Sequence, residues 1–292
     1  MLKIVVCCLV GLAAAGAGKA QPVTVLSYNI HHAEGMDGKI DLQRIAAVIK
    51  SVSPDAVALQ EVDRGAQRSG GIDQAKELER LTGLKMVFGR AIDFEGGQYG
   101  NAILSRLPIK GVTNHPLPYT EGREPRAVLA VEVVMPESGG GQTSFILLAT
   151  HLDQTRDPTD RLASSKAIAQ LAAKNPEIPT LLAGDLNSTP GSPAMTALGE
   201  HWQMPGAGRT WPTIPVANPT RQIDFVLFRP ANRWSVIEVR VLEEAVASDH
   251  RPILVRLELL PSPSAANRMT EAEIAASIAG TQGRSLQQPR EG

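Results

Sequence analysis

The amino-acid sequence predicts an α/β protein in which packed, largely antiparallel sheets are covered by helices. Two observations support this fold class. Short segments rich in Val, Ile, Leu and Phe follow one another from residue 22 to residue 260, and only four segments between them have a helical pattern. A doubly wound parallel sheet would need a helix between most pairs of strands. Hydrophobic residues make up 43% of the 292 residues, which is enough for a complete core.

Ten segments are expected to form strands, because each is short and apolar and most end at Gly, Pro, Asp or Asn. Apolar and polar residues alternate within residues 128–133, which favours strands with one buried face. The expected strands cover residues 23–30, 55–61, 85–89, 101–105, 127–135, 144–150, 179–184, 223–228, 236–241 and 253–259.

Four segments are expected to form helices. Asp41 is a suitable N-cap for a helix that runs through Val52, with Ile45, Val48 and Ile49 on the same face as Val52. A second helix is expected over residues 72–81 and a short one over residues 193–200. A further helix, over residues 160–174, should direct four residues toward the core: Leu162, Ile168, Leu171 and Ala172.

Residues 1–20 have the composition of a signal peptide. Lys3 precedes an apolar run over residues 4–15, and small residues follow it up to a plausible cleavage position before Gln21. The run is shorter than the roughly 20 residues of a comfortable membrane span, and an uncleaved anchor is the alternative. We therefore expect an exported protein, periplasmic or secreted, with no stable membrane span after cleavage. Both cysteines, Cys7 and Cys8, lie in this segment, so the mature chain would have no disulfide and no thiolate metal site.

The remaining chain is expected to form one domain over residues 21–260 and a mostly flexible tail over residues 261–292. The tail is polar, and a capping box at Thr270 and Glu273 indicates one short helical segment in it. The formal net charge is −1, and removal of the leader, which contains two lysines and no acid, changes it to −3. This charge excludes the strongly basic surface of a protein that is held mainly by polynucleotide phosphates.

Polar residues stand at the ends of the expected strands, where an ordinary core does not need them. Loops and strand ends on a rigid sheet are where functional sites are built. One such residue alone fits a turn or a solvated surface equally well, but their recurrence after successive strands favours a site. They are Asn29, Glu61, His151, Asp185, Asn187, Asp224, Asp249 and His250.

The types of these residues indicate phosphoryl chemistry. Most of them offer hard oxygen ligands of the kind that Mg²⁺ prefers, and clustered carboxylates need a cation to neutralise them. His151 and His250 are the members of the set that titrate near neutral pH. A cation that polarises a phosphate oxygen, a base for water and an imidazolium together form a plausible hydrolytic site.

Seven sequence blocks, in order, resemble the signature blocks of the endonuclease/exonuclease/phosphatase superfamily, which includes DNase I-like nucleases, abasic-site endonucleases, neutral sphingomyelinases and inositol-polyphosphate 5-phosphatases. The resemblance covers roughly residues 22–260. It implies a four-layer α/β/β/α sandwich, in which two mixed and largely antiparallel sheets are flanked by helices and the catalytic site lies at one rim of the sheets. The blocks are residues 27–30, 59–62, 100–105, 150–152, 184–187, 223–226 and 248–252.

The resemblance implies a metal site for Mg²⁺ or Mn²⁺. Glu61 would be its main carboxylate, with Asn29 and Asp249 close by. Abasic-site endonucleases have Asn-x-Asp in the first block, whereas this chain has Asn29-Ile30-His31-His32, so either one metal carboxylate is missing or His31 stands in for it. The block around these histidines looks most like a bacterial and fungal branch related to the remodellers of glycosylphosphatidylinositol-anchor lipids.

The resemblance also implies roles for the catalytic residues. Asp185 would orient or deprotonate the attacking water, and Asn187 would hold a phosphate oxygen. Asp224 would pair with His250, fix its tautomer and raise its pKa. His151 would be a second phosphate contact or the acid for the leaving group.

Contacts to the substrate phosphate are expected from Asn101, Arg123 and Arg126, because related enzymes place Arg before a strand in this region and the planar guanidinium suits phosphate. For these arginines a solvated position at the rim is the open alternative, as it is for three others: Arg64, Arg68 and Arg156.

These observations predict a divalent-metal-dependent phosphoesterase that acts on a small or lipid-type phosphate ester. A non-specific nuclease is the alternative within enzymes, although aromatic residues are only 4% of the chain and disfavour a stacking platform for single strands. A catalytically silent binding module on the same fold is the alternative from another class. A serine or thiol hydrolase is excluded, because the chain has no Gly-x-Ser-x-Gly motif and no cysteine beyond the leader.

Overall fold

The computed structural model describes residues 21–137, 141–206 and 208–262. The expected signal peptide at residues 1–20 and the expected helical segment of the tail lie outside these residues. Within them the chain forms eleven strands and four α-helices. No helix of this described part combines the length and the apolar character that a membrane span requires.

The strands form two mixed sheets. Seven of the nine neighbouring pairs are antiparallel, and the parallel pairs are β1–β2 and β7–β8. The first sheet has the order β10 (Trp234–Val241), β11 (Ile253–Leu259), β1 (Gln21–Asn29), β2 (Ala56–Arg64), β4 (Gly97–Ser105) and β3 (Lys85–Phe94). The second has the order β5 (Ile109–Pro116), β6 (Ala127–Pro136), β7 (Gln142–His151), β8 (Thr180–Asp185) and β9 (Asp224–Arg229).

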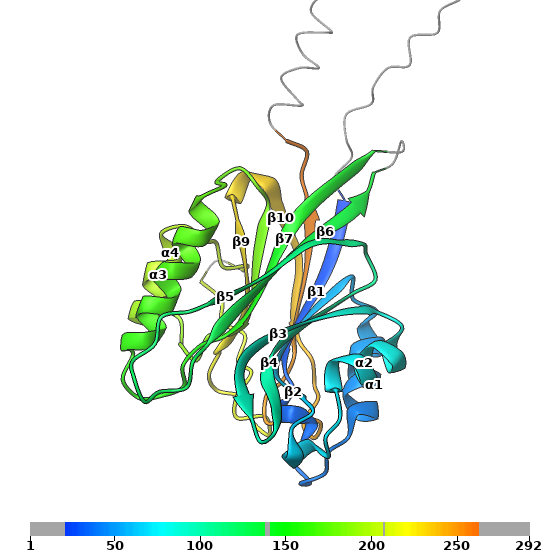
Figure 1. The fold of residues 1–292 in the computed structure, drawn as a ribbon. Coiled ribbons are helices and arrows are strands. Elements are labelled where there is room, and N and C mark those ends of the chain that lie inside the picture. The colour runs from blue at the N-terminus through cyan, green and yellow to red at the C-terminus, as the bar shows by residue number, and fades with distance from the viewer. Residues whose placement is uncertain (1–20, 138–140, 207, 263–292) are drawn as a thin grey trace, which may run out of the picture.

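Helices cover the outer faces of both sheets (Figure 1). Helices α1 (Leu42–Val52) and α2 (Gln74–Thr82) pack on the first sheet, and α3 (Thr159–Ala173) and α4 (Pro193–Gly199) pack on the second. Asp41 caps α1 as expected, since its side chain accepts a hydrogen bond from the backbone N–H of Arg44. The predicted four-layer α/β/β/α sandwich is therefore confirmed.

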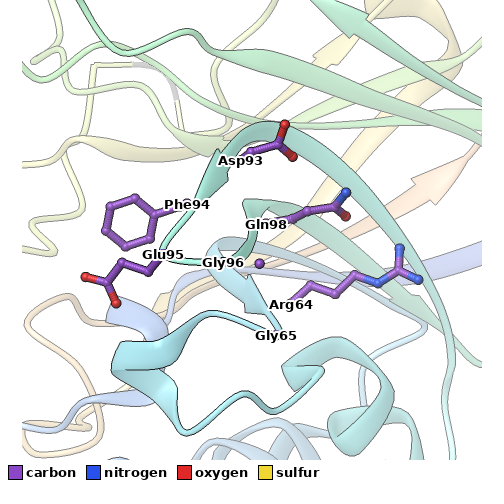
Figure 2. A pocket seen from close by; sticks show the side chains of 8 residues that line it. Arg64, Gly65, Asp93, Phe94, Glu95, Gly96 and Gln98 are labelled. Carbon is purple, nitrogen blue, oxygen red and sulfur yellow. The ribbon is translucent and has the colours of Figure 1, made fainter.

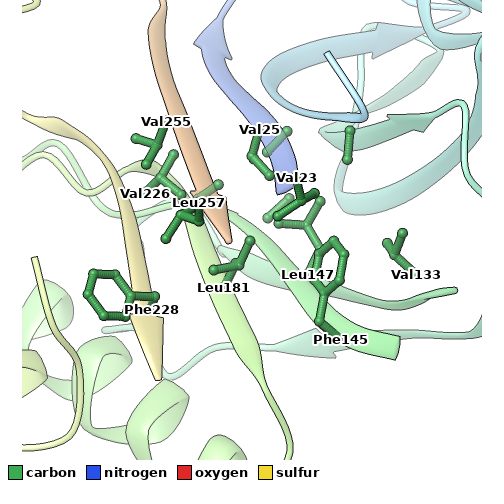
Figure 3. Close-up of a cluster of buried hydrophobic side chains, with 14 of the residues drawn as sticks. Val23, Val25, Val133, Phe145, Leu147, Leu181, Val226, Phe228, Val255 and Leu257 are labelled. Carbon is green, nitrogen blue, oxygen red and sulfur yellow. The ribbon is translucent and has the colours of Figure 1, made fainter. Parts of the chain in front are cut away.

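The alternation of side chains along the strands supplies both a core between the sheets and a core under the helices. On β1, Val23 and Val25 point into the core between the sheets, while Leu26 and Tyr28 point toward α1. Figure 3 shows valine and leucine side chains of the two sheets meeting in the first of these cores. Burial of one such side chain contributes about 1.5–3 kcal/mol to stability.

The sequence-based expectations differ from the structure at three places. Strand β5 was not expected, because it is an edge strand whose residues are mostly exposed and polar. Strand β6 has apolar residues buried on both faces, so the one buried face expected from residues 128–133 is wrong. On α3, Leu162 is only half-buried, and the small residues Ser164 and Ser165 take the buried positions.

Candidate active site

The strand register of the second sheet aligns three of the predicted site residues. His151 at the end of β7 lies beside Asp185 at the end of the parallel strand β8. Asp185 in turn pairs with Asp224, the first residue of the antiparallel strand β9. The close approach of β7 and β8 requires Gly184, because a Cβ atom there would clash with the carbonyl oxygen of Thr150.

The first sheet brings Asn29 and Glu61 to the same rim. Asn29 ends β1, opposite Gln60 of the parallel strand β2, and Glu61 follows within an irregularity of β2. Glu61 has a φ of 58°, in the left-handed region that is rare for residues other than glycine. Asn29 joins the two sheets, since its Nδ2 donates to Glu61 Oε1 at 3.0 Å and to Asp185 Oδ2 at 3.2 Å.

Asp185 is the centre of this arrangement. Besides Asn29, its Oδ2 has His151 Nε2 at 3.4 Å and His250 Nε2 at 3.8 Å, and its Oδ1 accepts from the backbone N–H of Asn187 at 2.8 Å. The carboxyl is buried. Burial, together with the charge of Asp224, raises the pKa of Asp185 to about 7, although His250 opposes the shift. The carboxyl can therefore exchange a proton near neutral pH.

Asp224 and His250 form a buried pair. His250 Nδ1 lies 2.9 Å from Asp224 Oδ2, and the Thr213 hydroxyl donates to the same oxygen at 2.5 Å. Burial lowers the pKa of His250, but the charge and hydrogen bond of Asp224, with Asp185 and Asp249, raise it to about 10. His250 is therefore a cation at neutral pH, and its Nε2 faces Asp185.

His151 has a different electrostatic environment. Its Nε2 is 3.0 Å from Asn187 Nδ2, and its Nδ1 is 3.2 Å from an Arg126 guanidinium nitrogen and 3.4 Å from the Tyr99 hydroxyl. Burial, followed by the charges of Arg126 and His250, holds the pKa of His151 well below its ordinary value. The ring is therefore neutral at pH 7, so of the two central histidines His250 carries the positive charge.

A cavity of about 260 Å³ opens beside this cluster. Phe94 and Tyr99 form part of its wall, and Arg68 lines it with its guanidinium 4.6 Å from the Phe94 ring centre. The guanidinium is held by Asp63, with both hydrogen bonds at 2.8 Å. The titratable lining consists of His31, His32, Glu61, Arg68, Tyr99, Glu124, His151 and Asp249.

The chemistry of this lining fits a divalent cation. Glu61, Glu124 and Asp249 give three carboxylates against the one guanidinium of Arg68. Such a set is unfavourable around a phosphate anion unless a cation neutralises it. Glu61 and Asp249 would hold the ion through oxygen. Asn29 turns its NH₂ group toward Glu61, while its oxygen accepts from the backbone N–H of His31, so its contacts position the carboxylate and give no support for its predicted role as a ligand.

None of the three predicted substrate contacts, Asn101, Arg123 and Arg126, is among the residues that line the cavity. Arg126 is buried beside His151 and pairs with Glu124 at 2.9 Å, and Asn101 donates to the carbonyl of Ala127 at 3.1 Å. Arg123 is not among the residues that line the cavity, and it pairs with Asp157 at 2.6 Å. Its expected contact to substrate phosphate has no support from its position.

A larger hollow of about 750 Å³ lies next to the cavity, at the β3–β4 hairpin (Figure 2). Phe94 lines both. The lining of the hollow has no cluster of histidines and carboxylates, and Arg64 pairs there with Asp73 at 3.2 Å. The smaller cavity, which adjoins Asp185 and His151, is therefore the candidate active site.

Several further contacts complete the site, and the sequence analysis did not predict them. Tyr99 and Arg126 contact the far nitrogen of His151, and Thr213 supports Asp224. The Ser248 hydroxyl donates to the carbonyl oxygen of Asn29 at 2.7 Å, and accepts from the backbone N–H of His250. Arg126 was predicted as a substrate contact and not as a partner of His151, and Ser248 lies in the last signature block beside Asp249. Tyr99 and Thr213 come from segments without a polar pattern at a strand end.

Comparisons with known proteins agree with this geometry. The uncharacterized protein YbhP of Escherichia coli K12 is 26% identical over 249 residues, which is 80% of this chain and 96% of YbhP. A 5'-tyrosyl-DNA phosphodiesterase of Caenorhabditis elegans is 29% identical over 177 residues, covering 58% of this chain and 44% of that enzyme. The crystal structure of an endonuclease/exonuclease/phosphatase from Beutenbergia cavernae is similar with a TM-score of 0.66 and 28% identity, covering 83% of this chain and 72% of that one.

The sequence also matches the Endonuclease/Exonuclease/phosphatase family over residues 26–250. This span includes every residue of the cluster around Asp185 and all the strands of both sheets except β11 and the first residues of β1. Members of the family are in general divalent-metal-dependent hydrolases of phosphate esters. The chain therefore belongs to the Endonuclease/Exonuclease/phosphatase family.

Proposed function

We propose that this protein is an exported, divalent-metal-dependent hydrolase of a small or lipid-type phosphate ester. The observation that carries the proposal is the meeting of Asn29, His151 and His250 at Asp185 Oδ2, next to a cavity with Glu61 and Asp249 in its wall. This arrangement combines a proton acceptor, a buried cation and carboxylates for a metal ion within one rim of the sandwich.

The metal ion would be Mg²⁺ or Mn²⁺ if oxygen ligands dominate. When bound, it neutralises the carboxylates and polarises a phosphate oxygen. Glu61 and Asp249 are half-exposed, so they can reach an ion that enters the cavity from solvent. Asn29 limits the freedom of Glu61 through its 3.0 Å hydrogen bond.

Asp185 is positioned to accept the proton of the attacking water. Its pKa of about 7 lies near neutral pH, so the carboxyl can accept a proton there and release it again, as a general base must. Asn29 and the backbone N–H of Asn187 hold both carboxylate oxygens in place. Asn187 has a φ of 47°, a left-handed conformation that Asn tolerates, and its Nδ2 lies 3.0 Å from His151 Nε2.

His250 would stabilise the negative charge that develops on the phosphate and the leaving group. Asp224 accepts a hydrogen bond from the Nδ1–H group of His250, so the Nε2–H group of His250 is the donor that faces the reaction centre. His151 is neutral, and it can contact a phosphate oxygen only as a hydrogen-bonding group. This assignment favours His250 over His151 as the source of positive charge.

The size and charge of the cavity favour a compact phosphate. A volume of about 260 Å³ suits a headgroup better than a duplex, and Arg68 is the single arginine in its lining. A protein that grips DNA along several phosphates needs a basic stripe. The resemblance of the first block to lipid remodellers supports a lipid-type ester, and the apolar run at residues 4–15 supports export.

A nuclease is the second candidate. The similarity to a 5'-tyrosyl-DNA phosphodiesterase favours it, because that name describes a phosphodiester in DNA. The nuclease would use the same cluster around Asp185, so the two candidates differ in the substrate and share the mechanism.

The deciding experiment compares substrates with the purified full chain under one Mg²⁺ and salt condition. The panel contains p-nitrophenyl phosphate, bis-p-nitrophenyl phosphate, phosphatidylinositol vesicles and plasmid DNA. We expect a higher kcat/KM for a small or lipid ester than for DNA phosphodiester bonds. Rapid plasmid degradation without turnover of the other substrates would establish the nuclease instead. An Asp185→Asn variant serves as the control for contaminating hydrolases.

A further inference from the structure

We propose that His31, His32 and Glu61 form a mixed nitrogen and oxygen site that binds a transition-metal dication, with Zn²⁺ as the representative, in preference to Mg²⁺. The inference rests on the proposed function in one respect, since Glu61 is also the carboxylate assigned to the catalytic cation. It goes further by naming two imidazole ligands and the class of ion that they select.

The three side chains converge on one point of the cavity wall. One ligand atom from each of His31, His32 and Glu61 lies within 4.8 Å of the other two. The two imidazole rings are 4.5 Å apart between centres and inclined by 63°, so they are not stacked and can aim at a common position. All three residues line the cavity of about 260 Å³ beside Asp249.

Glu34 contacts both histidines. In metal sites, residues behind the ligands commonly make such contacts to the ligating histidines. Its backbone carbonyl oxygen is 3.2 Å from His31 Nδ1, and its carboxylate Oε2 is 3.0 Å from His32 Nε2. Both groups are acceptors, so these two ring nitrogens have the protons. The lone pairs remain on Nε2 of His31 and Nδ1 of His32. Histidine ligands of metals commonly have this second hydrogen bond to a carbonyl or carboxylate, which fixes the tautomer.

The second, independent observation is a buried nitrogen without a partner. His32 is 7% exposed, and its Nδ1 is fully enclosed with no hydrogen-bond partner. An unpaired polar atom in a protein interior costs about 1–3 kcal/mol. A metal ion at this nitrogen would supply the missing interaction. The backbone of His32 is fixed from the other side, since Gln74 Nε2 donates to its carbonyl at 2.7 Å.

The backbone conformation of the segment is also unusual. His31, His32 and Ala33 have φ angles of 46°, 42° and 62°, three successive residues in the left-handed region. This region costs a residue other than glycine roughly 1–2 kcal/mol. Such strain is retained at sites where the surrounding structure fixes it for a function. Here it presents two adjacent imidazoles to the same cavity.

The two imidazole ligands change which metal ion the site prefers. Imidazole nitrogen suits Zn²⁺, Fe²⁺ and similar ions, whereas Mg²⁺ prefers oxygen and retains its waters. A site with one carboxylate and two imidazoles should therefore bind Zn²⁺ more tightly than Mg²⁺.

The test titrates Zn²⁺ alone into tag-free full chain labelled with ¹⁵N-histidine and follows the ring nitrogens by NMR. We expect one equivalent to shift the ligating nitrogens of two histidines, and excess Mg²⁺ not to reverse the shift. The signals are assigned with His31→Asn and His32→Asn, since Asn tolerates left-handed backbone. Each variant should weaken Zn²⁺ binding by at least about 10- to 100-fold in calorimetry, the range for the loss of an outer partner.

The control is His201→Asn, an exposed histidine after α4, which should bind Zn²⁺ as the wild type does. Circular dichroism verifies that the variants are folded, and the glutamine variant at the same position, His31→Gln or His32→Gln, replaces any that is not. Zn²⁺ shifts confined to His151 and His250, no shift at all, or unchanged affinity in the variants would each overturn the inference. Hydrolysis of phosphoesters is assayed separately, so an inactive protein that still binds Zn²⁺ through His31 and His32 would refute the proposed function and leave this site standing.

Discussion

Two regions of the molecule build the candidate site by different means. The row of His151, Asp185 and Asp224 lies on three neighbouring strands, and regular register places these side chains next to one another. The segment from His31 to Ala33 instead lies outside any sheet, in a backbone conformation that is unfavourable for its residues. The row is buried and charged, whereas His31 and Glu61 are half-exposed at the cavity.

This difference indicates that the two regions are suited to different parts of the reaction. Burial raises the pKa of Asp185, and the carboxylates of Asp224 and Asp185 raise that of the adjacent His250, so the row is suited to proton transfer and charge stabilisation. The segment beside Glu61 presents ligand atoms at the cavity, where His31 and Glu61 are half-exposed, so it is suited to holding an exchangeable ion. Substitutions in the two regions should therefore have different effects on activity and on stability.

Asp185→Asn should remove the proton acceptor and preserve the fold. We expect kcat/KM to fall by about 10²–10⁴, the usual contribution of general acid–base catalysis. The folded-state pKa of Asp185 is raised above the unfolded value, so its ionisation opposes folding as the pH rises toward and past 7. Urea unfolding at pH 8 should therefore find the variant at least as stable as the wild type. A large loss of stability with little loss of activity would make Asp185 a structural residue.

His250→Gln and Asp224→Asn should each lower kcat/KM by a factor in a similar range, about 10²–10⁴. Because Asp224 acts through His250 at 2.9 Å, the double variant should lose little more than either single variant. The measurement is a double-mutant cycle on kcat/KM. Effects that multiply would indicate that the two residues act separately.

The pH profile of activity should shift in the Asp224→Asn variant. In the wild type, activity should rise near pH 7 as Asp185 loses its proton and fall near pH 10 as His250 loses its proton. Asp224 raises both pKa values, so its neutralisation should shift both limbs of the profile to lower pH. A bound cation lowers the pKa of Asp185 in both proteins, so the profiles are compared at one metal concentration. Coincident profiles would contradict the pairing.

Backbone substitutions should change the free energy of unfolding by different amounts in the two regions. Gly184→Ala places a methyl group against the Thr150 carbonyl in the row, and overpacking of this kind typically costs about 1–3 kcal/mol. Ala33→Gly relieves a φ of 62°, so the free energy of unfolding should remain within about 1 kcal/mol of the wild type. Thermal unfolding measures both. Equal destabilisation by the two changes would remove the distinction between a regular and a strained region.

The sequence predicted the row better than the strained segment, for a physical reason. Asp185 and His151 come directly at strand ends, and the parallel register of β7 and β8 then brings them together. A polar residue at a strand end can be recognised in the sequence, and the pairing of the strands then places it next to the other site residues. Ten of the eleven described strands were predicted, and the missing one, β5, is an exposed edge strand without an apolar pattern.

The surroundings of the site could not be predicted, because they depend on contacts between distant segments. Glu34 contacts both His31 and His32 only because the chain turns through a left-handed conformation there. Arg123 was expected at the substrate, but three aspartates attract it: Asp153, Asp157 and Asp160. No sequence pattern predicts this network of ion pairs, since its members share neither a face nor a regular spacing.

The central claim is that Glu61 helps to hold a divalent cation on which phosphoester hydrolysis depends. Its most direct test measures hydrolysis as a function of added Mg²⁺, Mn²⁺ or Zn²⁺ after exhaustive chelation, for the wild type and for Glu61→Gln. The change is nearly isosteric and removes one charge, so the fold should persist. If Glu61 holds the cation, we expect no activity in the chelated wild type, recovery on addition of a metal, and little recovery in the variant at any concentration that saturates the wild type. Full activity after chelation, or wild-type turnover of the variant at low metal, would contradict it.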